Sequence, residues 1–178
     1  MYNTKNYVLM RDIITKHHPN FIESDQVRKV GLEHPEAFNI EFLIEQTLAY
    51  VGGYDFVDAA GYDFNDSCKS DSKTTSVNVK TRKVEINHVE NKIGALRITI
   101  FNPIKDEVDF MFIPAYHVNN ISKACFGTSQ FQRRVMMTWN NKQDHYNMFD
   151  KFRMPTFKDM AKATHQDWVK RKFGRIPN

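Results

Sequence analysis

The pattern of apolar and polar residues predicts a chain that combines helices with strands. Apolar residues recur at helical spacing over residues 35–51, which predicts an amphipathic helix that a pair of glycines terminates. Shorter helices are expected over residues 3–17 and 24–30. A last helix is expected to begin after Thr156, where an acidic residue three positions on completes a capping-box-like start, and to bury a stripe that reaches Trp168.

Other segments alternate between apolar and polar residues, which is typical of strands. Strands are expected over residues 70–79, 96–100 and 131–139, and a hydrophobic return strand over residues 108–113. Residues 115–130 lack periodicity and are expected to form a loop and a short helix. In the strand of residues 96–100 the apolar residues share one face and the polar residues the other: Leu96, Ile98 and Ile100 against Arg97 and Thr99. The pattern predicts an α+β fold with a central mixed β-sheet flanked by helices.

The length and composition fit one domain that spans residues 1–178. The 14 Phe and 7 Tyr argue against disorder throughout the chain. The two cysteines, Cys68 and Cys125, have neither zinc-ligand spacing nor a disulfide framework. The sequence contains no apolar run of about 18 residues and no signal-peptide segment. These features predict a protein that works in a reduced cytoplasm and does not enter a membrane.

The charge is distributed unevenly along the chain. Residues 1–122 carry 13 Lys and Arg against 17 Asp and Glu, a balance of −4, whereas residues 123–178 carry 12 against 4, a balance of +8. Such asymmetry is typical of a protein with a basic face for an anionic polymer. A solvated basic helix end is the alternative for the C-terminal third.

The densest group of chemically active side chains lies in residues 61–75. Asp71 and Lys73 are two positions apart, and residues i and i+2 of a strand project from the same face. Residues 65–68 have turn chemistry, so a hairpin is expected to bring Asp63 across from Asp71. Two carboxylates that meet one ammonium group suit Mg²⁺ and a phosphodiester, because oxygen ligands hold the ion while a lysine orients or deprotonates the attacking water.

Asp63 followed by Asp71-Ser72-Lys73 resembles the signature of the PD-(D/E)xK nucleases, in which an acid on one strand precedes an Asp/Glu-x-Lys on the next. The resemblance covers the helix, the hairpin and the strands that follow. It implies a restriction-endonuclease-like core, a Mg²⁺ cofactor that Mn²⁺ can replace, and DNA as the partner. The sequence departs from the family at Lys69, Ser70 and Ser72, because residues around the Asp/Glu-x-Lys motif are usually apolar in the family.

The first acid of the motif is open among three residues, and Asp63 is preferred over Asp66 and Asp58. In many nucleases of this family a helix before the hairpin offers a further acid to the metal, and Glu45 is the matching residue, with a plain solvent-facing glutamate as its alternative. The resemblance thus implies metal ligation by Asp63 and Asp71. It implies catalytic roles for a larger set: Asp63, Asp66, Asp71, Lys73 and Glu45.

Basic residues in four segments are candidates for binding the DNA backbone: Lys69, Lys92, Arg133, Arg134 and Lys142. Arg133 and Arg134 are neighbours in a predicted strand, so they point to opposite faces and at least one is expected to reach a phosphate. Lys92 has an exposed loop lysine as its alternative.

The predicted function is a Mg²⁺-dependent DNA endonuclease that works as a monomer or a homodimer. Within this class, size and composition resemble the endonuclease IV type of T-even bacteriophages, which degrades cytosine-containing host DNA and acts in the host cytoplasm. A small type II restriction endonuclease fits equally. From a different class, a non-catalytic phage nucleic-acid-binding protein needs only the basic asymmetry and the aromatic residues.

Overall fold

A computed structural model describes residues 40–86, 89, 93–102, 104, 107–118, 126–128, 133–138 and 151–167. Helix α4 covers Ile40–Gly52, and helix α7 covers Phe157–Lys162. The strands are β1 (Phe56–Ala59), β2 (Tyr62–Phe64), β3 (Asp71–Ser76), β4 (Lys83–Ile86), β5 (Leu96–Asn102), β6 (Glu107–Ile113), β7 (Phe126–Thr128), β8 (Arg133–Thr138) and β9 (Arg153–Met154). The helices predicted over residues 3–17 and 24–30 lie outside the described residues.

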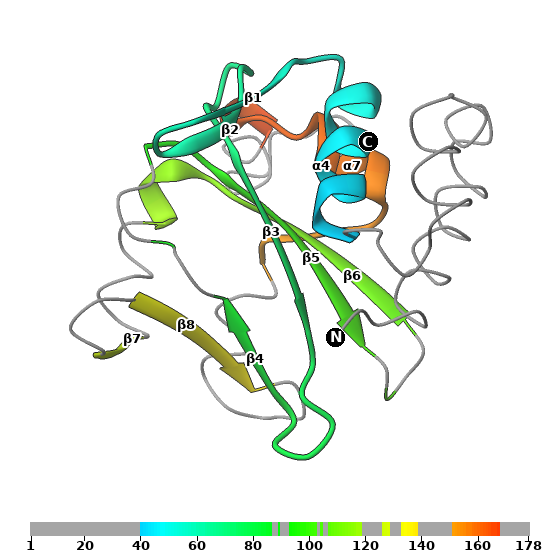
Figure 1. Ribbon diagram of the computed structural model, residues 1–178, viewed down its shortest axis with the longest axis vertical. Coiled ribbons are helices and arrows are strands. Elements are labelled where there is room, and N and C mark those ends of the chain that lie inside the picture. The colour runs from blue at the N-terminus through cyan, green and yellow to red at the C-terminus, as the bar shows by residue number, and fades with distance from the viewer. Residues whose placement is uncertain are drawn as a thin grey trace.

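A four-stranded mixed sheet organises the described part of the fold (Figure 1). β3 runs parallel to β5, β5 runs antiparallel to β6, and β6 pairs with the short β9, so β3 lies at one edge. The predicted long pair of strands is present, with Leu96 opposite Ile113 and Asn102 opposite Glu107. The prediction of an α+β fold with a mixed sheet and flanking helices is confirmed.

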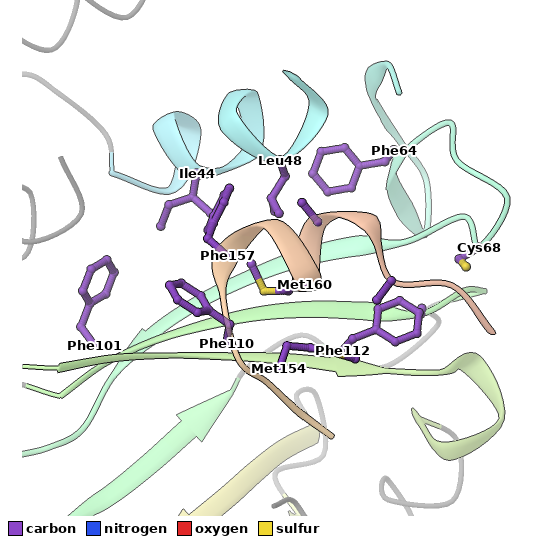
Figure 2. Close-up of a cluster of buried hydrophobic side chains, with 13 residues drawn as sticks. Ile44, Leu48, Phe64, Cys68, Phe101, Phe110, Phe112, Met154, Phe157 and Met160 are labelled. Carbon is purple, nitrogen blue, oxygen red and sulfur yellow. The ribbon is translucent and has the colours of Figure 1, made fainter. Parts of the chain in front are cut away.

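Both faces of this sheet are covered by apolar side chains. α4 and α7 pack on one face, where Ile44, Leu48 and Phe157 meet the aromatic residues of β5 and β6 (Figure 2). The other face packs against β4 through Val84 and Ile86. β4 itself belongs to a separate three-stranded sheet in the order β4-β8-β7 (Figure 1). The central sheet is therefore the middle layer of three.

The alternation predicted for β5 is present, but its polar face is buried. Leu96, Ile98 and Ile100 belong to the apolar cluster next to β4. Arg97 and Thr99 lie on the opposite face, which α4 and α7 cover, and Arg97 is only 2% exposed. A guanidinium group carries five N–H donors, and in such a place it must find its acceptors inside the protein.

Local signals place the helix ends. α4 ends at Gly52, as predicted, and Gly53 follows with a φ of 73°, a left-handed conformation that glycine adopts at little cost. α7 begins as predicted, since the side chain of Thr156 accepts a hydrogen bond from the backbone N–H of Asp159.

The last helix is shorter than predicted. α7 ends at Lys162 because Ala163 has an extended backbone with ψ of 143°. A second capping box follows, in which Thr164 N–H donates to Asp167 Oδ2 at 3.0 Å and Asp167 N–H donates to Thr164 Oγ1 at 3.3 Å. The chain therefore restarts a helical turn instead of continuing the first one, and Trp168 lies outside the described residues.

Two predictions that concern strands were correct only in part. β2 pairs antiparallel with β1, with Phe56 opposite Phe64, and not with β3, because Gly61 at φ 89° turns the chain tightly between β1 and β2. The segment predicted to be a loop and short helix does contain a short helix at residues 115–118, but it also contains strand β7. With three residues, one of them Gly127, β7 is too short to show alternation. Within the described ranges, no helix has both the length and the apolar character needed to cross a membrane.

Candidate active site

β3 carries the Asp-x-Lys pair at the edge of the central sheet. Lys73 Nζ forms an ion pair with Asp71 Oδ2 at 2.9 Å, as expected for two residues on one face of a strand. The side chain of Asp71 is 3% exposed and that of Lys73 is 18% exposed. Charges in such a partly dehydrated place interact more strongly than charges in water. The juxtaposition predicted for these two side chains is therefore present.

Asp63 reaches the same place from β2. Asp71 N–H donates to Ala95 O, into the sheet, so the N–H of Ser72 points toward the outer edge of β3. Asp63 Oδ2 accepts that N–H at 2.7 Å. Asp63 N–H in turn donates to Ser70 O at 3.0 Å. These two hydrogen bonds fix Asp63 against the edge strand and put its carboxylate beside the residue that follows Asp71.

Glu45 enters from helix α4, which lies beside β3. Burial, followed by the negative charges of its neighbours, raises the pKa of Glu45 from its ordinary value of 4.5 to about 7. The neighbours responsible are Asp63, Glu41, Asp58 and Asp71. The pKa of a glutamate that faces open solvent would not be raised by four carboxylates, because water screens their charges. Glu45 therefore belongs to the same acidic group as the two strand aspartates.

These side chains line one cleft of about 310 Å³ between α4, the edge of β3, and β4. Its charged lining consists of five acids and one lysine: Glu41, Glu45, Asp63, Asp71 and Glu85 with Lys73. Thr74, Thr75 and Ile86 complete much of the remaining wall. The excess of carboxylates over ammonium groups makes the cleft a place where a cation is favoured.

The donor chemistry of the cleft fits a hard cation. In the described part of the chain, no group of three or more His, Cys, Asp and Glu side chains is already arranged around a common metal position. Mg²⁺ does not need such a cage, because it keeps several waters and binds proteins through one or two carboxylates. Asp63 and Asp71 meet that requirement, whereas a structural zinc site needs four nitrogen or sulfur ligands.

The raised pKa of Glu45 predicts how a metal-free protein responds to pH. Between about pH 4.5 and pH 7 the folded chain retains the Glu45 proton that the unfolded chain loses, so the free energy of unfolding falls as pH rises through this window. Glu45→Gln removes that penalty. In EDTA the variant should match the wild type near pH 4 and exceed its stability at pH 8 by about 1 kcal/mol, allowing for solvent in the cleft.

Urea denaturation at the two pH values measures this difference. Gln46→Ala, on the same helix turn, is the matched control because it changes no ionisable group. A Glu45→Gln variant less stable than the wild type at pH 8 would mean that the folded protein favours the Glu45 carboxylate, against the prediction.

The other two candidates for the first acid lie elsewhere. Asp66 Oδ1 accepts Ser70 N–H at 2.8 Å, and Asp66 Oδ2 accepts from Ser70 Oγ and from Arg97 Nη2, both at 2.7 Å. Burial alone would raise the pKa of Asp66, but the hydrogen bonds from Arg97 and Ser70 outweigh it and hold that pKa below its ordinary value. Asp58 is exposed on β1. Of the three acids, only Asp63 lines the cleft.

The predicted DNA-binding residues are distributed over several segments. Lys69 Nζ donates to Asn65 Oδ1 and lies 5.2 Å from the centre of the Tyr62 ring, outside the cleft lining. Arg133 and Arg134 occupy adjacent positions of β8, as the alternation predicted. Lys92 and Lys142 lie outside the described residues.

Sequence reasoning did not single out Glu85 as part of the site. The alternation of Val84 and Ile86 predicts that Glu85 lies on the opposite face of its strand, which is the only signal the sequence contains. A tertiary contact brings Glu85 to the cleft, because Thr75 Oγ1 donates to Glu85 O at 2.8 Å and holds β4 beside β3.

A scan against protein-family models gives no match to this chain, and a search of curated proteins gives none either. The function must therefore be inferred from the cleft itself.

Proposed function

We propose that this protein is a metal-dependent nuclease that hydrolyses phosphodiester bonds in DNA, built on a restriction-endonuclease-like core. The observation that carries the proposal is the convergence on one cleft of an acid from α4, an acid from β2, and the Asp-x-Lys of β3. These residues follow one another along the chain as Glu45, Asp63, Asp71 and Lys73, which is the order of the PD-(D/E)xK signature with its helical acid.

Asp63 and Asp71 are the residues that would hold Mg²⁺ or Mn²⁺, with the Ser72 carbonyl as a further oxygen donor. The bound ion would supply Lewis-acid chemistry and activate a water molecule. Glu45 lines the cleft from the helix side, where burial and then four neighbouring carboxylates raise its pKa to about 7. A cation bound in the cleft would offset this repulsion and favour the Glu45 carboxylate.

Lys73 is the cationic member of the site. It pairs with Asp71 as an ammonium group, and an ammonium group has three N–H donors and no acceptor. In that state it can orient the attacking water and offset the negative charge that develops on the phosphate, but it cannot accept a proton. Its role in the proposed reaction is therefore positioning and charge stabilisation.

Binding of the DNA backbone is assigned to surfaces outside the acidic cleft. The carboxylates of the cleft repel phosphates until a cation is bound. The last 56 residues, with their balance of +8, supply the attraction, and binding through phosphates is salt-sensitive and largely independent of sequence. The reaction thus combines a basic binding surface with a metal-dependent centre.

The test is cleavage of supercoiled plasmid and single-stranded DNA in Mg²⁺, in Mn²⁺ and in EDTA. We expect nicking in either metal and none in EDTA. Asp71→Ala should lower the cleavage rate by at least about 100-fold, because it removes both a metal ligand and the partner of Lys73. Asp55→Ala, an exposed aspartate outside the cleft, is the matched control and should cleave like the wild type.

DNA binding without cleavage in any of these conditions would exclude the nuclease. The protein would then be a non-catalytic nucleic-acid-binding protein. Equal cleavage by the wild type and Asp71→Ala would mean that the activity comes from another site or from a contaminant.

A further inference from the structure

One buried arginine connects the mixed sheet, helix α7 and the loop that precedes β3. Arg97 Nε donates to Ser70 Oγ at 2.9 Å, and its Nη2 donates to Asp66 Oδ2 at 2.7 Å and to Ala163 O at 3.0 Å. Its Nη1 donates to Met160 O. The guanidinium carbon lies 5.2 Å from the centre of the Tyr54 ring and 4.9 Å from that of Phe112. Hydrogen bonds and ring contacts thus fix the position of this guanidinium group.

Ser70 is where this buried network meets the candidate active site. Asp66 takes both the N–H and the hydroxyl of Ser70, and Arg97 donates to the same hydroxyl. The carbonyl of Ser70 then accepts the N–H groups of Asp63, at 3.0 Å, and of Phe64, at 3.1 Å. Every polar group of Ser70 is therefore used: the N–H and the hydroxyl bond to the buried network, whereas the carbonyl holds Asp63 and Phe64.

The geometry connects this serine to both proposed metal ligands, to one by a peptide bond and to the other by a hydrogen bond. Asp71 is the next residue in the chain, and Asp63 is held directly by the Ser70 carbonyl. A small rotation of the Ser70 peptide would move Asp63 relative to Asp71. Carboxylates that share one metal ion tolerate little relative movement, which is why groups behind the ligands affect metal affinity.

We propose that Asp66, Ser70 and Arg97, here called the Ser70 clamp, are positioning residues that set the distance between the metal-binding carboxylates of Asp63 and Asp71. This inference rests on the proposed function, because it assigns a role toward the same metal. It gives Asp66 a role distinct from that of a metal ligand: its carboxylate fixes the serine that fixes Asp63.

If the Ser70 clamp had a purely structural role, the expected effect of its loss on metal binding would be different. If the clamp only stabilises the fold, any variant that loses a comparable buried hydrogen bond should affect metal binding equally. Tyr54 offers the matched case, since its hydroxyl donates to Ala161 O at 2.9 Å and its ring contacts Arg97, but it has no bond to Ser70. Tyr54→Phe therefore removes a hydrogen bond to α7 and leaves the clamp intact.

The experiment measures Mn²⁺ binding by calorimetry for the wild type, Ser70→Ala, Ser70→Thr and Tyr54→Phe, with Asp71→Asn to show that binding occurs at the proposed site. Ser70→Ala should weaken Mn²⁺ binding by about tenfold or more. Ser70→Thr keeps the hydroxyl and should recover most of the affinity, and Tyr54→Phe should bind like the wild type. Amide hydrogen exchange at Asp63 and Phe64 should accelerate in Ser70→Ala and not in Tyr54→Phe.

The outcomes separate the two proposals. Unchanged Mn²⁺ affinity in Ser70→Ala, or an equal loss in Tyr54→Phe, overturns the positioning role. Absence of Mn²⁺ binding in the wild type contradicts the proposed function instead. In that event the clamp is judged by amide exchange: unchanged exchange at Asp63 and Phe64 in Ser70→Ala overturns it, and selective acceleration supports its hold on Asp63. If Ser70→Ala does not fold, Asp66→Asn replaces it in both measurements.

Discussion

Replacing Lys73 with alanine is expected to slow DNA cleavage by about 10²- to 10³-fold at saturating metal while leaving Mn²⁺ binding intact. The lysine donates to Asp71 across 2.9 Å, so it stands beside the proposed metal ligand without being a ligand itself. Its removal takes away the ammonium group that orients water and offsets phosphate charge. It also removes a cation that competes with the metal for the Asp71 carboxylate, so Mn²⁺ affinity should hold or rise.

Single-turnover cleavage together with Mn²⁺ calorimetry tests whether the loss of Lys73 affects the cleavage rate without weakening metal binding. Lys80→Ala changes an exposed lysine between β3 and β4 that lies outside both the cleft and the basic C-terminal third, so it controls for the loss of one positive charge and should cleave at close to the wild-type rate. Wild-type cleavage by Lys73→Ala would exclude the lysine from the chemistry. Parallel losses of Mn²⁺ binding and of cleavage would show that Lys73 acts by holding Asp71 in place.

The fold was predictable where periodicity and caps act locally. The α4 stripe, the alternation in β5 and the Thr156 cap depend on neighbours within one or two turns, and the structure reproduces each of them. One failure is long-range. The end of α7 depends on Ala163, whose carbonyl is taken by Arg97, 66 residues earlier in the chain. No local pattern records that contact.

In the candidate site, too, local features were predictable from the sequence and long-range contacts were not. Asp71 and Lys73 were placed together by strand geometry alone, because two residues of one strand need no knowledge of the rest of the chain. Asp66 looked equivalent to Asp63 in sequence, since both are aspartates near one turn. What distinguishes them is Arg97, which lies 31 residues away and draws Asp66 into the protein.

Gly94 shows how much of the site's support is invisible in the sequence. A Cβ atom at this position would lie 2.0 Å from the carbonyl oxygens of both Cys68 and Lys69, so only glycine fits against the chain that leads into β3. The next residue, Ala95, donates to Cys68 O and accepts from Asp71 N–H. Close packing between these two segments, not a motif, brings Asp71 into register.

The second large effect is expected from Arg97→Ala, which should lower the free energy of unfolding by about 3–5 kcal/mol at pH 7. Arg97 and Asp66 form a buried pair, with side chains 2% and 6% exposed. Removing the arginine leaves a buried carboxylate without its cation. It also leaves two carbonyls without their donor, that of Met160 in α7 and that of Ala163, which follows α7. Urea denaturation of the metal-free protein measures the loss.

The pH dependence of this loss identifies its cause. The pKa of Asp66 is depressed in the folded wild type, so its contribution to stability is complete above the ordinary carboxyl pKa of 3.8 and is lost as pH falls below it. The difference in the free energy of unfolding between wild type and Arg97→Ala should therefore narrow when the measurement is repeated near pH 3.

Arg153→Ala is the control. Arg153 pairs with Asp109 at 3.6 Å, but its side chain is 35% exposed, so this ion pair should contribute less than about 1 kcal/mol. Two results would contradict the prediction: a loss of stability for Arg97→Ala no larger than that for Arg153→Ala, or a loss that does not change with pH. Either would mean that the buried pair contributes little to stability, and Arg97 would then not be the residue that fixes the Ser70 clamp.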